Sequence, residues 1–221
     1  MRHRLLTFIL GLLMANLAMA TSLQLPEKHP DLNTTESKRL GTLDEGIGIP
    51  VGTMVSNFSI KDHKGTMVEF EQLKTQGPLM VVFYRGGWCP YCNRQIRQLT
   101  EAWPEFKKRN VLPVLISADK PDGAALAAAT YEIPFPVLSD PELVAHKVFN
   151  VTMKLDDKLI PMYKQYGIDL EEWSGKDHHQ FAVSSVFILN RQGKVLWAHS
   201  AKDYKTRPST SQLLNVIDYT F

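Results

Sequence analysis

Residues 79–92, LMVVFYRGGWCPYC, decide how the rest of this sequence is interpreted. Leu79 to Tyr84 form a continuous apolar run, with Gly77-Pro78 before it and Gly86-Gly87 shortly after it. An uninterrupted apolar run of this length is typical of a strand buried on both faces, as in a parallel sheet covered by helices. The stretch therefore predicts a buried strand that ends in a glycine turn directly before a Cys-x-x-Cys segment.

A helix is expected to begin within that segment and to continue to Lys108. Pro90 suits the first helical position, which places Cys89 at or near the N-cap. Pro104 should kink or shorten the helix because proline lacks the backbone N–H that an interior position needs. Four apolar residues then recur at helical spacing and form one stripe: Ile96, Leu99, Trp103 and Phe106.

The two cysteines are the candidate catalytic residues. A Cys89 thiolate at the helix N-terminus would face unpaired N–H groups and the positive end of the helix dipole, with Arg85 close by, and all three lower a thiol pKa. Cys89 is therefore expected to be the exposed, reactive thiolate. Cys92 continues the apolar stripe and is expected to be more buried and less acidic. Adjacent positions on one helical face lie ~5–6 Å apart, within the range that a disulfide accepts. The spacing predicts that Cys89 attacks, that Cys92 resolves, and that Trp88 shields the pair.

Other uses of the two thiols remain open at this point. The chain has only two cysteines, and a bridge that closes so short a loop stabilises a fold weakly, so an inert structural disulfide is disfavoured. His178 and His179 could help the cysteines to hold copper or zinc, although adjacent histidines in a polar stretch are more often a solvated loop. No cofactor is expected beyond a redox-active Cys89–Cys92 disulfide.

The first twenty residues have the pattern of a secretory signal peptide. Arg2 and Arg4 precede an uncharged, mostly apolar run over residues 5–14, and Ala18-Met19-Ala20 matches the small-x-small cleavage pattern. The mature chain should then begin at Thr21 and be exported, to the periplasm in a Gram-negative bacterium and otherwise outside the cell. A short uncleaved anchor is the alternative, and no stable membrane insertion is expected after cleavage.

Charge and length bound the mature protein. Of 25 basic and 23 acidic residues, cleavage removes two arginines and leaves 23 of each sign over 201 residues. A neutral balance does not favour nucleic acid as a partner, because that needs a concentrated basic face. Residues 21–50 lack helical or strand periodicity and are expected to form a leader segment that is loose or lies over the domain surface. Residues 51–221 are expected to form a single domain.

The elements of this domain alternate along the chain. An opening hairpin is expected over 57–70, and the apolar strand and helix around the cysteines follow it. A closing hairpin over 186–199 and a helix over 209–219 end the domain. The segments between them are expected to be a strand at 114–118, a helix at 121–130, a short strand at 136–138, a helix at 142–149 and a helix around 161–166. This order predicts an α/β fold, a three-layer sandwich with a central mixed sheet and an N-terminal hairpin extension.

Residues 83–92 resemble the active-site segment of the peroxiredoxin-like branch of the alkyl hydroperoxide reductase / thiol-specific antioxidant family. Residues 186–193 and 203–208 resemble a late strand and a tail segment of the same branch, so the resemblance covers about residues 51–221. It implies a thioredoxin-like fold with Cys89 in the place of the peroxide-attacking cysteine. In that alignment Gly86 stands where typical members have threonine or serine, and Ser184 stands where thioredoxins have a cis-proline.

Three functions follow from these residues. In the first, Cys89 and Cys92 reduce a hydroperoxide, and an external thiol reductant such as a thioredoxin-like protein resets them. In the second, the same pair exchanges disulfides with other exported proteins. In the third, the thiols handle copper without catalysis. Arg85, Trp88, Pro90 and Ser184 are the residues expected to activate the thiol or position the substrate. Asp203-Tyr204 and Arg207-Pro208 are expected to form a capped loop, with a direct catalytic role as the alternative.

Overall fold

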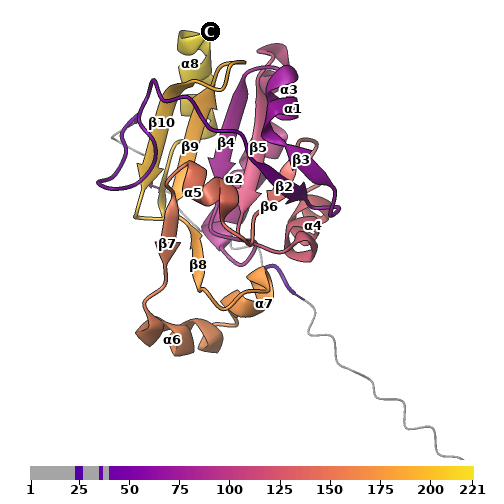
Figure 1. The fold of residues 1–221 in the computed structure, drawn as a ribbon, viewed down its shortest axis with the longest axis vertical. Helices are drawn as coiled ribbons and strands as arrows, with labels where there is room; N and C mark the ends of the chain where they lie inside the picture. The colour runs from indigo at the N-terminus through magenta and orange to yellow at the C-terminus, as the bar shows by residue number, and fades with distance from the viewer. Residues whose placement is uncertain (1–22, 27–34, 37–39) are drawn as a thin grey trace, which may run out of the picture.

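The fold is built on one seven-stranded mixed sheet with helices on both faces (Figure 1). The computed structural model describes residues 23–26, 35–36 and 40–221. The strand order is β10-β9-β4-β5-β6-β2-β3; β4, β5 and β6 are parallel, and the other pairs are antiparallel. These strands are β2 (Ser59–Asp62), β3 (Met67–Glu69), β4 (Leu79–Phe83), β5 (Leu112–Ser117), β6 (Val137–Ser139), β9 (Ser184–Leu189) and β10 (Val195–Ala201).

The helices divide between the two faces of this sheet. Side chains of α2, α3, α4 and α8 join the core on one face, and those of α1 and α5 join the core on the other. Their bounds are α1 (Phe70–Thr75), α2 (Pro90–Glu101), α3 (Trp103–Lys108), α4 (Pro121–Thr130), α5 (Val144–Val148) and α8 (Thr210–Thr220). The expected three-layer α/β sandwich is confirmed.

The central strand β4 shows why the apolar run has this role. Every residue of β4 is buried. Because side chains alternate between the faces of a strand, Met80 and Val82 enter the core beneath α2, whereas Leu79, Val81 and Phe83 enter the core beneath α1 and α5. A strand with both faces covered needs apolar residues at every position, as the sequence predicted.

Most of the expected elements are confirmed, with three local differences. The helix after the cysteines is divided at Ala102, and Pro104 lies in the first turn of α3, where a missing N–H costs little. The helix expected at 142–149 begins only at Val144, although Asp140 still accepts hydrogen bonds from its first turn, from the backbone N–H groups of Val144 and His146. The third difference is α1, which the sequence did not predict.

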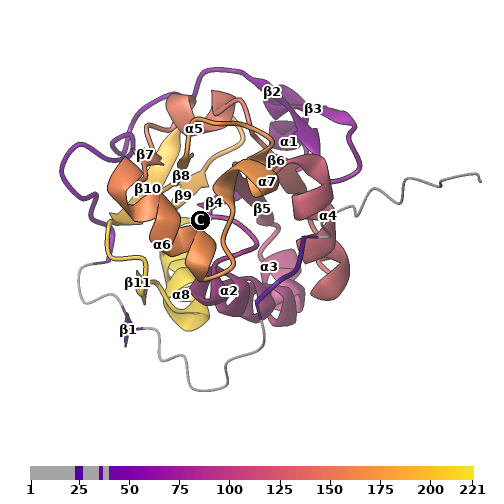
Figure 2. The same cartoon turned by 90° about the horizontal axis from the view of Figure 1, so that it is seen from below.

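The segment between α5 and β9 folds over the end of the sheet at which β4 finishes. It carries α6 and α7 between two short paired strands, and both views place these helices beyond the arrowhead of β4 (Figures 1 and 2). Its elements are β7 (Thr152–Lys154), a 3-10 turn (Asp157–Leu159), α6 (Ile160–Gln165), α7 (Leu170–Ser174) and β8 (Gln180–Ala182). Only α6 was predicted. We call residues 152–182 the cap segment.

The described parts of the expected leader lie over the domain surface, which is the second of the two expected arrangements. Leu43 and Ile49 pack on the core beneath α1, and Leu25 packs on the other core. Asp44 accepts a hydrogen bond from the Lys202 N–H, and its own N–H donates to Ser200 Oγ. Further upstream, β1 (Thr35–Glu36) pairs in parallel with β11 (Thr206–Arg207).

The expected signal peptide, residues 1–20, lies outside the described residues. Within the described ranges, the structure contains no helix whose length and apolar character would let it cross a membrane.

Candidate active site

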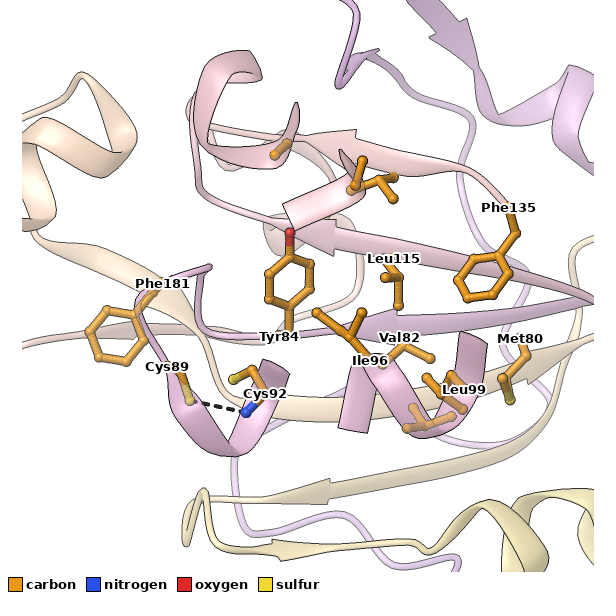
Figure 3. Close-up of a cluster of buried hydrophobic side chains, with 14 of the residues drawn as sticks. Met80, Val82, Tyr84, Cys89, Cys92, Ile96, Leu99, Leu115, Phe135 and Phe181 are labelled. Carbon is orange, nitrogen blue, oxygen red and sulfur yellow. Dashed lines mark hydrogen bonds between the residues drawn. The ribbon is translucent and has the colours of Figure 1, made fainter. Parts of the chain in front are cut away.

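The two cysteines lie where β4 gives way to α2. Cys89 is the N-cap of α2 with extended backbone angles, and Pro90 follows in the first turn, as the sequence predicted. The backbone N–H of Cys92 donates to Cys89 Sγ at 3.4 Å, which Figure 3 marks with a dashed line. Both residues are free thiols in this structure, so the pair is in its reduced form.

Both sulfur atoms are shut off from solvent. Cys89 is 1% exposed and Cys92 is 0% exposed, so the expectation that Cys89 is an exposed thiol is wrong. The sequence missed this burial because the covering side chains come from the cap segment and from the loop after β10. Trp88 packs edge-on against Tyr163 of α6 and Phe181 of β8, and Tyr91 packs edge-on against Tyr204. A substrate can reach the sulfurs only when part of this cover moves.

Arg207 reaches the thiol pair from a distant part of the chain. Its Nη2 donates to Cys92 Sγ at 3.2 Å and to Ser184 Oγ at 2.8 Å, and its Nη1 donates to Gln95 Oε1 at 2.6 Å. Its Nε donates to the Tyr204 carbonyl at 3.0 Å, which ties the guanidinium to its own loop. Arg207 contacts the Cys92 sulfur directly, as the catalytic alternative for the Arg207-Pro208 loop requires. Ser184 reaches the thiol pair through its hydrogen bond with Arg207.

These contacts make Cys92, rather than Cys89, the acidic thiol. Burial raises the pKa of Cys92. The hydrogen bond from Cys89, the charge of Arg207 and the Arg85 backbone N–H outweigh burial and lower this pKa to about 5. Burial, the hydrogen bond with Cys92 and the Cys92 charge raise the pKa of Cys89 well above its usual value. These directions are the opposite of the predicted order of acidity, because the hydrogen bond from Cys89 and the charge of Arg207, which the sequence places 115 positions from Cys92, both favour the thiolate of Cys92.

Arg85 is a second buried cation beside the pair. Its guanidinium lies 4.4–4.9 Å from the ring centres of Tyr204, Phe181 and Trp88, and its Nη2 donates to the Tyr163 hydroxyl at 2.8 Å. In the described part of the chain, the hydrogen-bond partners of Arg85 and Arg207 are neutral groups apart from Cys92. A Cys92 thiolate is thus the anion that these two guanidinium groups face.

Two hydrogen bonds, one at the N–H and one at the carbonyl of Gly87, hold the loop that carries Cys89. The Gly87 N–H donates to Asp119 Oδ2 at 2.8 Å, and Asn93 Nδ2 donates to the Gly87 carbonyl at 2.7 Å. Gly86 has φ +151°, and a Cβ there would collide with Trp88 Nε1 and Asp119 Oδ1. The glycines that end the apolar strand are therefore required by the close approach of the surrounding side chains.

Asp119 and Asn93 were missed by the sequence analysis. A signal for Asp119 was present, because it follows a buried strand whose end is expected beside the end of the cysteine strand. Asn93 gave no such signal, since a polar residue on a helix is usually exposed.

His178 and His179 do not join the cysteines. His178 Nε2 lies 3.0 Å from the Pro141 carbonyl, and His179 Nε2 lies 2.8 Å from Glu171 Oε1. No group of three or more His, Cys, Asp or Glu side chains among the described residues is arranged to hold a metal ion. The geometry gives the copper hypothesis no support.

Comparisons with known proteins identify the family. Residues 51–198, more than half of the chain, match the AhpC/TSA family. The chain belongs to this family.

Two kinds of curated protein share its sequence. Peroxiredoxin Q of the chloroplast of Populus jackii is 29% identical over 121 residues, which are 55% of this chain and 52% of that protein. The thiol-disulfide oxidoreductase ResA of Bacillus thuringiensis (strain Al Hakam) is 29% identical over 91 residues, or 41% of this chain and 51% of that protein. The matched stretches span about half the length of these relatives.

Solved structures show the same fold. Peroxidoxin BcpB from Mycobacterium tuberculosis superimposes with a TM-score of 0.61 at 20% identity, covering 79% of this chain and 99% of that one. Peroxiredoxin Q from Xanthomonas campestris superimposes with a TM-score of 0.55 at 18% identity, covering 73% of this chain and 90% of that one. The expected thioredoxin-like fold is confirmed for this AhpC/TSA protein.

Proposed function

We propose that this AhpC/TSA protein is an oxidoreductase that reduces hydroperoxides through a dithiol–disulfide cycle of Cys89 and Cys92. The observation that carries the proposal is the contact of Arg207 with Cys92 Sγ inside a closed site. With this contact, Cys92 is a thiolate at neutral pH. The thiolate form of a cysteine, rather than the thiol form, is the nucleophile. The closed site favours a small electrophile over a folded protein.

The acidity of the two thiols supports attack by Cys92 and resolution by Cys89, the reverse of the roles that the helix position suggested. The Cys92 thiolate attacks the terminal oxygen of the hydroperoxide and the O–O bond breaks, so that Cys92 becomes a sulfenic acid. The alkoxide that leaves takes a proton from water and becomes the alcohol. Cys89 then displaces water from that sulfenic acid and forms the disulfide. An external dithiol reductant, such as a thioredoxin-like protein, returns both thiols.

Exchange with protein disulfides is the second candidate, and the similarity to ResA favours it. The same two cysteines would then attack a substrate disulfide and form a mixed disulfide. The aromatic cover over the sulfurs weighs against it, because a folded substrate must displace more of the cap segment than a peroxide does.

The first twenty residues support export of this protein, since their charge and apolar pattern is that of a cleaved signal peptide. The proposed compartment is the periplasm of a Gram-negative bacterium, or otherwise the cell exterior.

Two serine variants test the roles and the substrate together. The reduced protein should consume hydrogen peroxide faster than it reduces a model disulfide. Cys92→Ser should lose peroxide reduction, because the nucleophile is gone. Cys89→Ser should complete one attack and stall as a Cys92 sulfenic acid, which a carbon nucleophile traps and mass spectrometry locates.

Each other outcome has a clear meaning. A sulfenic acid that is trapped on Cys89 in Cys92→Ser would restore the original assignment of roles. A mixed disulfide with a protein substrate, together with slow peroxide consumption, would favour disulfide exchange. No trapped species in either variant would overturn the proposed function.

A further inference from the structure

Gln95 is a buried polar side chain beside the thiol pair, and it does not take part in the cycle proposed above. It lies three residues after Cys92 on α2 and is 5% exposed. Residues three apart on a helix share one face, so α2 presents the Cys92 sulfur and the Gln95 amide next to each other. A buried amide is costly unless it is hydrogen-bonded, so the partner of Gln95 indicates why the amide is there.

The partner is the Arg207 guanidinium, which bonds both of these acceptors on α2. Its Nη1 donates to Gln95 Oε1 at 2.6 Å, and its Nη2 donates to Cys92 Sγ at 3.2 Å. Arginine presents its donors in a rigid planar fork. With one bond at each end of the fork, the position of the guanidinium is set by the same helix that carries the sulfur. Gln95 thus holds Arg207 against Cys92.

The lack of charge on Gln95 matters as much as its hydrogen bond. The two acceptors of Arg207 outside α2, the Ser184 hydroxyl and the Tyr204 carbonyl, are neutral as well. A carboxylate in place of the amide would accept the same hydrogen bond, but it would also pair with the cation. The Cys92 thiolate would then face a neutralised guanidinium and a nearby like charge, and its pKa would be higher for both reasons.

We propose that Gln95 is a positioning residue that holds the Arg207 guanidinium on the Cys92 sulfur and, as a neutral amide, leaves the positive charge to the Cys92 thiolate. It acts through Arg207 and not on the substrate. The inference rests on the proposed function, in which Cys92 is the attacking thiolate.

The other groups that act on the charge of Cys92 stay the same when residue 95 is replaced. A difference between variants at this position therefore reports the side chain of residue 95. Besides Arg207, these groups are Cys89, Arg85, Tyr84 and Asp119.

Titration of the Cys92 thiol in a Cys89→Ser background tests the proposal, because thiolate absorbance reports a single thiol there. With Gln95 in place, the midpoint should lie close to the Cys92 pKa of about 5. Gln95→Glu keeps the acceptor and adds a charge, so the midpoint should rise by about one to two pH units. Gln95→Met adds no charge but removes the acceptor. Its midpoint should also rise, by less, because Arg207 is held less firmly but stays unneutralised.

Gln98→Glu is the matched control, because it adds the same charge to α2 one turn further along the helix. Gln98 is half-buried, and the hydrogen bonds of Arg207 among the described residues do not include it. This variant should leave the midpoint nearly unchanged. If Gln95→Glu does not fold, Gln95→Met still decides: a raised midpoint supports the role of Gln95, and an unchanged midpoint overturns it.

Two further results would contradict the proposal. A midpoint that stays low in both Gln95 variants would show that Arg207 needs no help from this amide. Equal rises in Gln95→Glu and Gln98→Glu would assign the shift to the net charge of α2 rather than to the contact with Arg207. The expected midpoints in a protein that forms no trappable Cys92 sulfenic acid with hydrogen peroxide would instead overturn the proposed function and support the role of Gln95.

Discussion

Arg207 and the hydrogen bond from Cys89 together lower the pKa of Cys92. Arg207 is 4% exposed, and its guanidinium donates hydrogen bonds to a sulfur, a hydroxyl, an amide and a carbonyl group. Arginine fits this position because its planar fork presents several fixed donors and stays charged when buried. A lysine has one point charge and could not bond all four partners in the same geometry.

Replacement of Arg207 should therefore change the pH dependence of Cys92. Because the Cys92 pKa is about 5, this thiol is almost fully ionised from pH 6.5 upward. The reactivity of Cys92 should therefore be constant over that range. In Arg207→Gln the pKa should rise toward the usual value, so reactivity should increase with pH through the neutral range and fall roughly tenfold at pH 7. Thiolate absorbance in a Cys89→Ser background measures the midpoint.

Arg207→Lys is the companion variant for that titration. It keeps the positive charge and should give an intermediate midpoint. An unchanged midpoint in Arg207→Gln would show that the hydrogen bond from residue 89 and the Arg85 backbone N–H account for the acidity without Arg207.

At the scale of elements, the cap segment controls which molecules can reach the sulfur atoms of Cys89 and Cys92. Helix α6 contacts the active site through Tyr163, whose hydroxyl accepts a hydrogen bond from Arg85 and whose ring packs against Trp88. This short helix stands at the end of the sheet (Figures 1 and 2). The Tyr163–Arg85 hydrogen bond is thus a latch between the cap segment and the loop that carries Cys89.

Loss of this latch should open the site to larger reagents. Tyr163→Phe keeps the aromatic ring and removes only the hydroxyl. Because a hydrogen bond to a charged group contributes about 1.5–3 kcal/mol, alkylation of the thiols by a bulky maleimide should accelerate roughly tenfold. Hydrogen peroxide reaches the thiols without full opening of the cap segment, so the rate of its reaction should change little. Stopped-flow rates for both reagents provide the comparison.

Tyr166→Phe is the control for that measurement, since Tyr166 is 71% exposed on the same segment. It should leave both rates unchanged. A Tyr163→Phe protein with an unaltered maleimide rate would place the moving part elsewhere, with the loop of Tyr204 as the next candidate.

The elements that could be predicted from the sequence are those whose pattern is local. The strand of Leu79–Phe83 and the N-cap position of Cys89 follow from a continuous apolar run and from a proline at the first helical position. The cap segment escaped prediction because its short strands and helices have too few residues to show a period. The acidity of Cys92 escaped because Arg207 is a long-range neighbour, and no local rule brings the two together.

At the scale of the whole molecule, residues 40–50 are part of the folded domain. The Ser200 N–H donates to the Thr42 carbonyl, and Asp44 holds the Lys202 N–H, so this stretch covers the edge of β10. An edge strand with free N–H groups is a site for unwanted pairing with other chains. The segment therefore protects the sheet as well as packing on its core.

A chain that begins at Val51 should be less stable than one that begins at Thr21. Removal of Leu43 and Ile49 exposes apolar surface, at a cost of about 2–4 kcal/mol for two partly buried side chains. That loss corresponds to a Tm lower by about 5–10 °C for a domain of this size. Thermal unfolding followed by circular dichroism measures it.

A third chain, beginning at Leu40, keeps these contacts and should unfold close to the longest one. Equal Tm values for all three chains would show that residues 21–50 are dispensable for stability.

The separation of 115 positions between Cys92 and Arg207 also sets an order of events in time. A growing polypeptide presents its N-terminal part first, so both cysteines emerge well before the guanidinium that activates one of them. Until the last strand and helix have formed, Cys92 is a thiol of ordinary acidity and a poor nucleophile at neutral pH. Chemical reactivity thus becomes a sign of completed folding, and unfinished copies stay comparatively inert toward oxidants.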